Sequence, residues 1–106
     1  MINQHSLDAV DSRKSGIQTL MPLYDSYCFS NLNILFSHLL GTGAETRMPL
    51  QVLGDSPHFF KKIVFIYLDA FGWDVFEKFN RKSSLLARIL EEGQVSKITS
   101  QFPSST

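Results

Sequence analysis

The segment that most constrains the fold of this chain is an apolar run that ends in a carboxylate and a glycine. It reads Lys62-Ile63-Val64-Phe65-Ile66-Tyr67-Leu68-Asp69-Ala70-Phe71-Gly72-Trp73. Residues 63–68 are rich in β-branched and aromatic types and do not alternate with polar ones, which is typical of a parallel strand covered on both faces. We therefore expect an α/β fold in which parallel strands are flanked by helices.

Asp69 stands at the carboxyl end of this predicted strand. In open α/β sheets, ligands and catalytic groups collect beyond that end of the strands, so Asp69 is a candidate for chemistry. A purely structural interpretation is also open. Aspartate is a favoured helix cap, and Asp69 could cap the short helix expected after Gly72.

The composition limits the classes of function. The 106 residues allow one small domain, and ten basic side chains balance ten acidic ones, which leaves no net field to attract nucleic acid or anionic lipid. The single Cys28 cannot form an internal disulfide, and no cysteine and histidine spacing indicates a structural zinc site. The N-terminus lacks the apolar core of a signal peptide, and no apolar run could span a bilayer. We expect a soluble, cytoplasmic protein that binds neither nucleic acid nor membranes.

Helix signals divide the rest of the chain. Residues 1–16 are polar and predict a flexible N-terminal segment, so the domain is expected over 17–106. Capping residues and apolar spacing predict a helix over about 31–40, and residues 41–57 carry the glycines and prolines of a long loop. A further helix is expected to begin at Ser83 or Ser84, to bury a stripe of leucine and isoleucine, and to end at Gly93.

A second strand is predicted over 94–100, where polar and apolar residues roughly alternate. A strand, two helices and a strand fit a right-handed parallel crossover, which would point both carboxyl ends the same way. The second strand runs into Gln101-Phe102-Pro103-Ser104-Ser105-Thr106, so hydroxyls would share a rim with Asp69. A hydroxyl becomes a good nucleophile when a metal ion or a base lowers its pKa. A neighbouring carboxylate is a suitable ligand for such a metal ion. The alternative is a hydroxyl-rich turn that caps a following helix.

These motifs, in this order and spacing, resemble a known enzyme family. Asp-Ala-Phe-Gly-Trp at 69–73 and Glu-Glu-Gly-Gln-Val-Ser-Lys-Ile-Thr-Ser-Gln-Phe-Pro-Ser-Ser-Thr at 91–106 resemble the type I phosphodiesterase/nucleotide pyrophosphatase branch of the alkaline phosphatase superfamily. Tyr24-Asp25-Ser26-Tyr27 followed by Ser30-Asn31-Leu32 is similar to the leader of its bacterial members. The resemblance implies an alkaline-phosphatase-like α/β core, two divalent metal ions, usually zinc, and a phosphodiester or nucleotide-like substrate.

The resemblance also implies roles for individual residues. Asp69 would be a metal ligand, and Thr106 would be both a metal ligand and the nucleophile that attacks phosphorus, with Ser105 less favoured. Two metal ions would activate the attacking oxygen and neutralise charge on the leaving oxygen.

The chain also departs from the family pattern. The family continues past the position of Thr106 with a helix and further aspartate and histidine ligands, and none of His5, His38 and His58 occupies the place of such a ligand. A catalytic zinc takes about three protein ligands. We therefore expect this chain to correspond to the N-terminal portion of a hydrolase, inactive alone, with an incomplete sheet.

A different class of function remains open. The chain could be a non-enzymatic remnant or a small interaction module that keeps the strands and helices. A fragment of this kind would also leave sheet edges exposed around 63–68, which predicts self-association.

Overall fold

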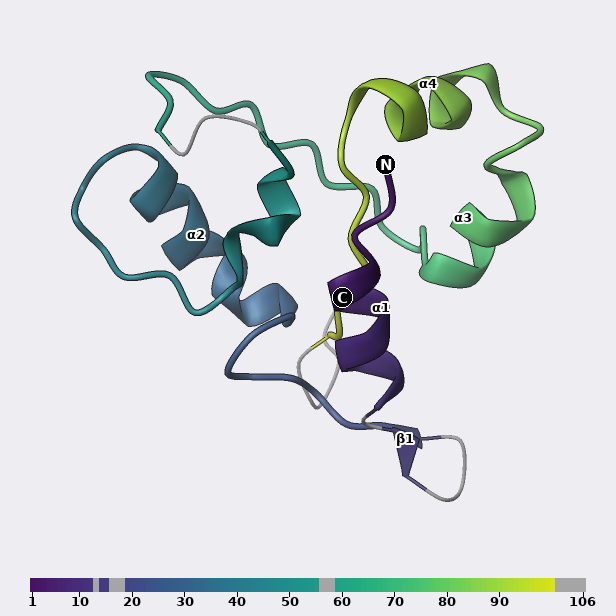
Figure 1. The fold of residues 1–106 in the computed structure, drawn as a ribbon, viewed down its shortest axis with the longest axis horizontal. Coiled ribbons are helices and arrows are strands. Elements are labelled where there is room, and N and C mark those ends of the chain that lie inside the picture. The colour runs from purple at the N-terminus through teal and green to yellow at the C-terminus, as the bar shows by residue number, and fades with distance from the viewer. Residues whose placement is uncertain (13, 16–18, 56–58, 101–106) are drawn as a thin grey trace.

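Short helices joined by long irregular segments make up this computed structural model, which describes residues 1–12, 14–15, 19–55 and 59–100 (Figure 1). The helical elements are α1 Gln4–Asp11, η1 Phe29–Asn31, α2 Leu32–Leu39, η2 Leu50–Leu53, α3 Trp73–Phe79 and α4 Ser84–Glu92, where η denotes a 3-10 helix. Within the described ranges, the strands are the short antiparallel pair β1 Lys14–Ser15 and β2 Thr19–Leu20, with Lys14 opposite Leu20.

The predicted parallel α/β core is wrong. Residues 63–68 form neither a helix nor a strand, and no backbone hydrogen bond joins them to another described residue. The run is also not covered on both faces, because Val64 and Ile66 are among the most exposed apolar side chains. An apolar run specifies burial, whereas a strand also needs a neighbouring backbone to receive its hydrogen bonds.

The second predicted strand, 94–100, is reduced to isolated parallel bridges. Ile2 bridges to Val95 and Cys28 bridges to Thr99. The Asn3 backbone N–H donates to the Val95 carbonyl at 2.7 Å, so the N-terminus and residues 94–97 run side by side (Figure 1). Among the described residues, the bridges of this segment are to Ile2 and Cys28, and none joins it to 63–68, so the predicted crossover is wrong.

The helices predicted around local caps are confirmed. α2 occupies most of the predicted range 31–40, and α3 follows Gly72. In α4, the Ser83 hydroxyl accepts a 3.3 Å hydrogen bond from the Leu86 N–H, and Gly93 is the C-cap. The predicted burial of the apolar stripe on α4 is wrong, because Leu85 is 66% exposed and Ile89 is also exposed.

The N-terminal residues differ from the flexible segment that we predicted over 1–16. The structure describes α1 there, with Val10 buried and the Asn3 side chain accepting from the Ser6 N–H as an N-cap. Ser6 is buried as well, and its hydroxyl accepts from the Lys97 N–H at 2.9 Å. These contacts attach α1 to residues 94–97. The domain boundary at residue 16 stays a prediction.

The hydrophobic core lies between α1, α2 and the segments beside them. Its buried members are Val10, Leu23, Tyr27, Leu35, Leu39 and Met48. The radius of gyration is 14.3 Å, above the roughly 13 Å typical of a compact domain of about 100 residues. In the described ranges, no helix combines the length and apolar character needed to cross a membrane. Ile63, at the start of the run that ends in Asp69, packs against this core.

Candidate functional site

Asp69 lies in an exposed turn between residues 63–68 and α3. Its Oδ1 accepts a 2.8 Å hydrogen bond from the Ala70 N–H, and Ala70 has a φ of 59°, in the left-handed region that alanine rarely adopts. The N-cap of α3 is Gly72, which has no side chain to form a cap, so Asp69 does not cap this helix. The carboxylate is accessible, and its geometry is set by the local turn.

The described residues do not form a complete metal site. Among them, no group of three or more histidine, cysteine, aspartate or glutamate side chains could hold a metal ion. His5 and His38 are engaged elsewhere, because their Nδ1 atoms lie 2.7 Å from the Tyr27 hydroxyl and 2.8 Å from the Ala44 carbonyl. A single carboxylate such as Asp69 supplies one hard oxygen ligand, fewer than the three that a catalytic zinc takes.

Two of the predicted participants fall outside the described residues. The hydroxyl-rich turn at 101–106 contains Ser105 and Thr106, and His58 is also outside. The structure therefore places Asp69, and the predicted nucleophile Thr106 lies outside the described residues.

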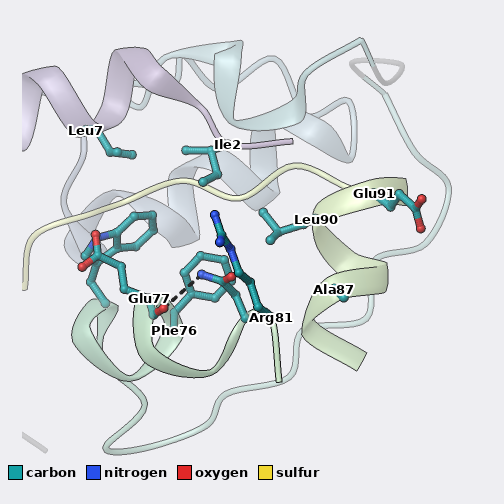
Figure 2. A pocket seen from close by; sticks show the side chains of 10 residues that line it. Ile2, Leu7, Phe76, Glu77, Arg81, Ala87, Leu90 and Glu91 are labelled. Atoms are coloured by element: carbon teal, nitrogen blue, oxygen red, sulfur yellow. Dashed lines mark hydrogen bonds between the residues drawn. The ribbon is translucent and has the colours of Figure 1, made fainter. Parts of the chain in front are cut away.

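A second candidate site is an open groove of about 830 Å³ between the start of the chain, α3 and α4 (Figure 2). Its wall is largely apolar, and Figure 2 shows the Arg81 side chain extending from the turn after α3 toward Ile2. The lining residues include Ile2, Trp73, Phe76, Glu77, Arg81, Leu90 and Glu91. A few polar groups on an apolar wall are typical of small-molecule sites, where the polar groups fix orientation.

Local hydrogen bonds hold one side of this groove. The Trp73 Nε1–H donates to Glu77 Oε1 at 2.7 Å, and the Asn80 side-chain amide donates to the Glu77 carbonyl at 3.3 Å, the dashed line in Figure 2. The Lys97 ammonium lies 5.7 Å from the centre of the Trp73 ring and 2.9 Å from Asp11 Oδ1. Carboxylates and cations therefore both lie around the groove. Its net charge does not favour an anion over a cation.

Sequence reasoning did not identify this groove. The helical spacing of Trp73, Phe76, Glu77 and Asn80 is a signal that these side chains share one face of α3. Ile2 carries no such signal, because the pairing of Ile2 with Val95 joins opposite ends of the sequence.

A third feature is an apolar groove of about 660 Å³ beside the exposed face of α4. Its lining includes Leu68, Phe71, Phe79, Leu85 and Ile89, all of them exposed apolar side chains. Apolar surface therefore continues from the end of the 63–68 segment to α4. Contiguous exposed apolar surface marks sites of association more often than sites of chemistry.

The hydroxyl of Tyr27 has a shifted pKa, but Tyr27 belongs to the hydrophobic core. Burial raises the pKa of its hydroxyl above the ordinary value, and the hydrogen bond from the Asn3 side-chain amide acts in the opposite direction. Tyr27 is fully buried in the core, so this shift bears on stability.

Comparisons with known proteins identify no relative of this chain. No protein-family model matches it, and no curated protein and no solved structure matches it significantly.

Proposed function

We propose that this chain is part of a metal-dependent phosphoric-ester hydrolase similar to the type I phosphodiesterases and nucleotide pyrophosphatases. In this proposal Asp69 binds one of two divalent ions, usually zinc in that family, and Thr106 is the nucleophile. The observation that carries the proposal is the accessible carboxylate of Asp69, whose Oδ1 accepts only the local bond from Ala70 among the described residues. The sequence resemblance at 69–73 and 91–106 supports it.

The described residues alone do not fit the metal centre. They contain no ligand set beyond Asp69, so the remaining ligands must come from residues outside the described ranges or from another polypeptide. We therefore expect the 106-residue chain to show no zinc-stimulated hydrolysis by itself. A phosphodiester or nucleotide-like small molecule is the proposed substrate, and a cytoplasmic location is part of the same proposal.

A second candidate function is a small interaction module without chemistry. The specific observation in its favour is the exposed apolar surface that runs from Val64 to Leu68. A soluble protein rarely leaves such a surface without a partner.

Manganese titration of the chain followed by NMR tests the role of Asp69. A metal held by Asp69 broadens the amide signals of residues 69–72 first, and Asp69→Asn removes this localised effect. Asp74→Asn is the matched control, because Asp74 is another exposed carboxylate close by, in the first turn of α3. Broadening that is equal around both carboxylates, or that persists in Asp69→Asn, contradicts the proposal.

Hydrolysis of bis(4-nitrophenyl) phosphate tests the enzymatic claim. A longer product of the same reading frame, carrying the missing ligands, is expected to be active with zinc and to lose activity in both Asp69→Asn and Thr106→Ala. Activity that survives both substitutions rules out this site, whereas a longer product with no zinc-dependent activity favours the interaction module. Activity of the 106-residue chain that is lost in Thr106→Ala would instead show that the chain is sufficient alone.

A further inference from the structure

Residues 63–68 have the alternation of a strand, although they are unpaired in the described structure. The side chains of Val64, Ile66 and Leu68 are 86%, 75% and 65% exposed, whereas those of Phe65 and Tyr67 are 53% and 56% exposed. The Phe65 ring lies 5.1 Å from the Phe36 ring of α2, and the Tyr67 ring lies 5.6 Å from the Phe29 ring of η1. One face of the segment therefore rests on these helices, and the other faces solvent.

The backbone of this segment is open to pairing. Among the described residues, none shares a backbone hydrogen bond with 63–68, which leaves a row of donors and acceptors along an apolar, β-prone segment. Such an edge is a template for another strand. Charges flank it on both sides, with Lys61 and Lys62 before it and Asp69 after it, and all of them are exposed.

We propose that residues 63–68 pair antiparallel with the same residues of a second copy of this chain. The dimer is a two-stranded sheet with a two-fold axis beside Phe65, and Lys61 of each copy lies opposite Asp69 of the other. This inference is independent of the proposed hydrolase function.

Symmetry restricts the possible registers. A two-fold axis through an antiparallel pair is perpendicular to the sheet, so every side chain keeps its face, and opposite residues must both be odd-numbered or both be even-numbered. With the axis beside Phe65, Lys61 faces Asp69 and Ile63 faces Tyr67. These side chains lie on the face that rests on α2. The α2 helices of the two copies therefore cover the same side of the sheet.

Charge selects this register and this occupant. Opposite charges directly across an antiparallel pair stabilise it, whereas like charges destabilise it. A parallel pairing would bring Lys61 beside Lys61 and Asp69 beside Asp69. An antiparallel pairing centred on Ile66 would place Asp69 opposite Ile63, without a charge partner. When two copies pair antiparallel, the positive end of one segment therefore lies opposite the negative end of the other. This favours a second copy over an unrelated protein.

Analytical ultracentrifugation over a wide concentration range tests the association. The wild-type chain is expected to show a reversible monomer–dimer equilibrium. Lys61→Glu places like charges at both ends of the pair and is expected to weaken the dimer about tenfold, as should Asp69→Lys. The double variant Lys61→Glu with Asp69→Lys restores opposite charges and is expected to return to near wild-type affinity. Lys62→Glu is the matched control, because Lys62 lies opposite the uncharged Leu68, so reversing its charge removes no cross-strand charge pair.

Cysteine cross-linking tests the register. Under oxidation, Phe65→Cys is expected to give a disulfide-linked dimer, because its Cα atom lies about 4.5–5.5 Å from its equivalent in the second copy. Ile66→Cys is expected not to cross-link, because the equivalent residues would be diagonal neighbours roughly 7–8 Å apart. The native Cys28 is buried and lies outside the pairing segment.

Three results overturn the proposal. The first is a chain that stays monomeric at all concentrations. This result includes a monomer in which another part of the same chain covers residues 63–68. The second is an association that ignores the charge reversals or proceeds to large aggregates. The third is a cross-link that forms at residue 66 in preference to residue 65.

Discussion

The hydroxyl of Thr99 donates a 2.8 Å hydrogen bond to the backbone carbonyl of Tyr27. The same hydroxyl accepts a 2.9 Å hydrogen bond from the Leu23 N–H, and the Thr99 backbone N–H also donates to the Tyr27 carbonyl. Thr99 and both of its partners are buried. This arrangement attaches residues 94–99 to the core in the absence of a continuous strand.

Thr99→Val is expected to lower the free energy of unfolding by about 1–3 kcal/mol, because the buried Leu23 N–H loses its acceptor while side-chain volume is kept. Thr99→Ser keeps the hydroxyl and should lose less. Urea unfolding followed by circular dichroism measures both variants. Equal stabilities for Thr99→Val and the wild type would mean that this hydrogen bond does not fix the segment.

The buried Tyr27 hydroxyl predicts a loss of stability at alkaline pH. Its pKa is raised in the folded state, so the folded protein holds the phenolic proton more tightly than the unfolded chain. The resulting stabilisation is fully present below the unfolded pKa of about 10 and is lost as the pH rises through the folded pKa. The free energy of unfolding should therefore fall more steeply above about pH 10 in the wild type than in Tyr27→Phe. Parallel slopes in this range would contradict the prediction.

Substitutions at Met48 and Leu85 compare the contribution of the core to stability with that of the exposed face of α4. Met48 belongs to the buried cluster, and Leu85 is 66% exposed. Met48→Ala is expected to cost roughly 2–5 kcal/mol of unfolding free energy, whereas Leu85→Ala should stay within about 0.5 kcal/mol. Urea unfolding at low protein concentration compares the two variants. A large cost at Leu85 would indicate that the stripe on α4 is buried in solution.

Ala70→Gly is expected to raise the free energy of unfolding by up to about 1 kcal/mol, because Ala70 has a φ of 59° that glycine adopts without strain. Ala70→Val should lower it, since a β-branched residue is more strained there. Thermal unfolding of the two variants against the wild type measures the effect. A destabilising glycine would show that the turn after Asp69 is not left-handed in solution.

Helices α2, α3 and α4 could be predicted from the sequence because their signals are local, whereas α1 lies in the segment that we predicted to be flexible. Ser83 and Gly93 define the ends of α4 within a few residues, and Gly72 precedes α3. The same local patterns also indicated a buried stripe on α4, which was wrong. Amphipathic spacing shows which side chains share a face, but it does not supply the partner that would cover that face.

The sheet could not be predicted because strand pairing is non-local. The apolar run at 63–68 looks like a central strand, yet residues 94–99 bridge to Ile2 and Cys28 instead. Neither pairing is visible in local composition, since each depends on which backbone the tertiary structure brings near. For the site, the sequence singled out Asp69, and the structure places its carboxylate in an exposed turn, while the groove beside Arg81 depends on contacts between distant segments.

Amide hydrogen exchange of residues 63–68, measured as a function of protein concentration, tests most directly whether this segment is an unpaired edge that pairs with a second copy. The expected result is fast exchange in dilute solution and protection that grows with concentration, with the concentration for half protection shifted about tenfold upward in Lys61→Glu. Protection that is independent of concentration would place 63–68 in an intramolecular sheet. That result would contradict both the fold described here and the proposed dimer.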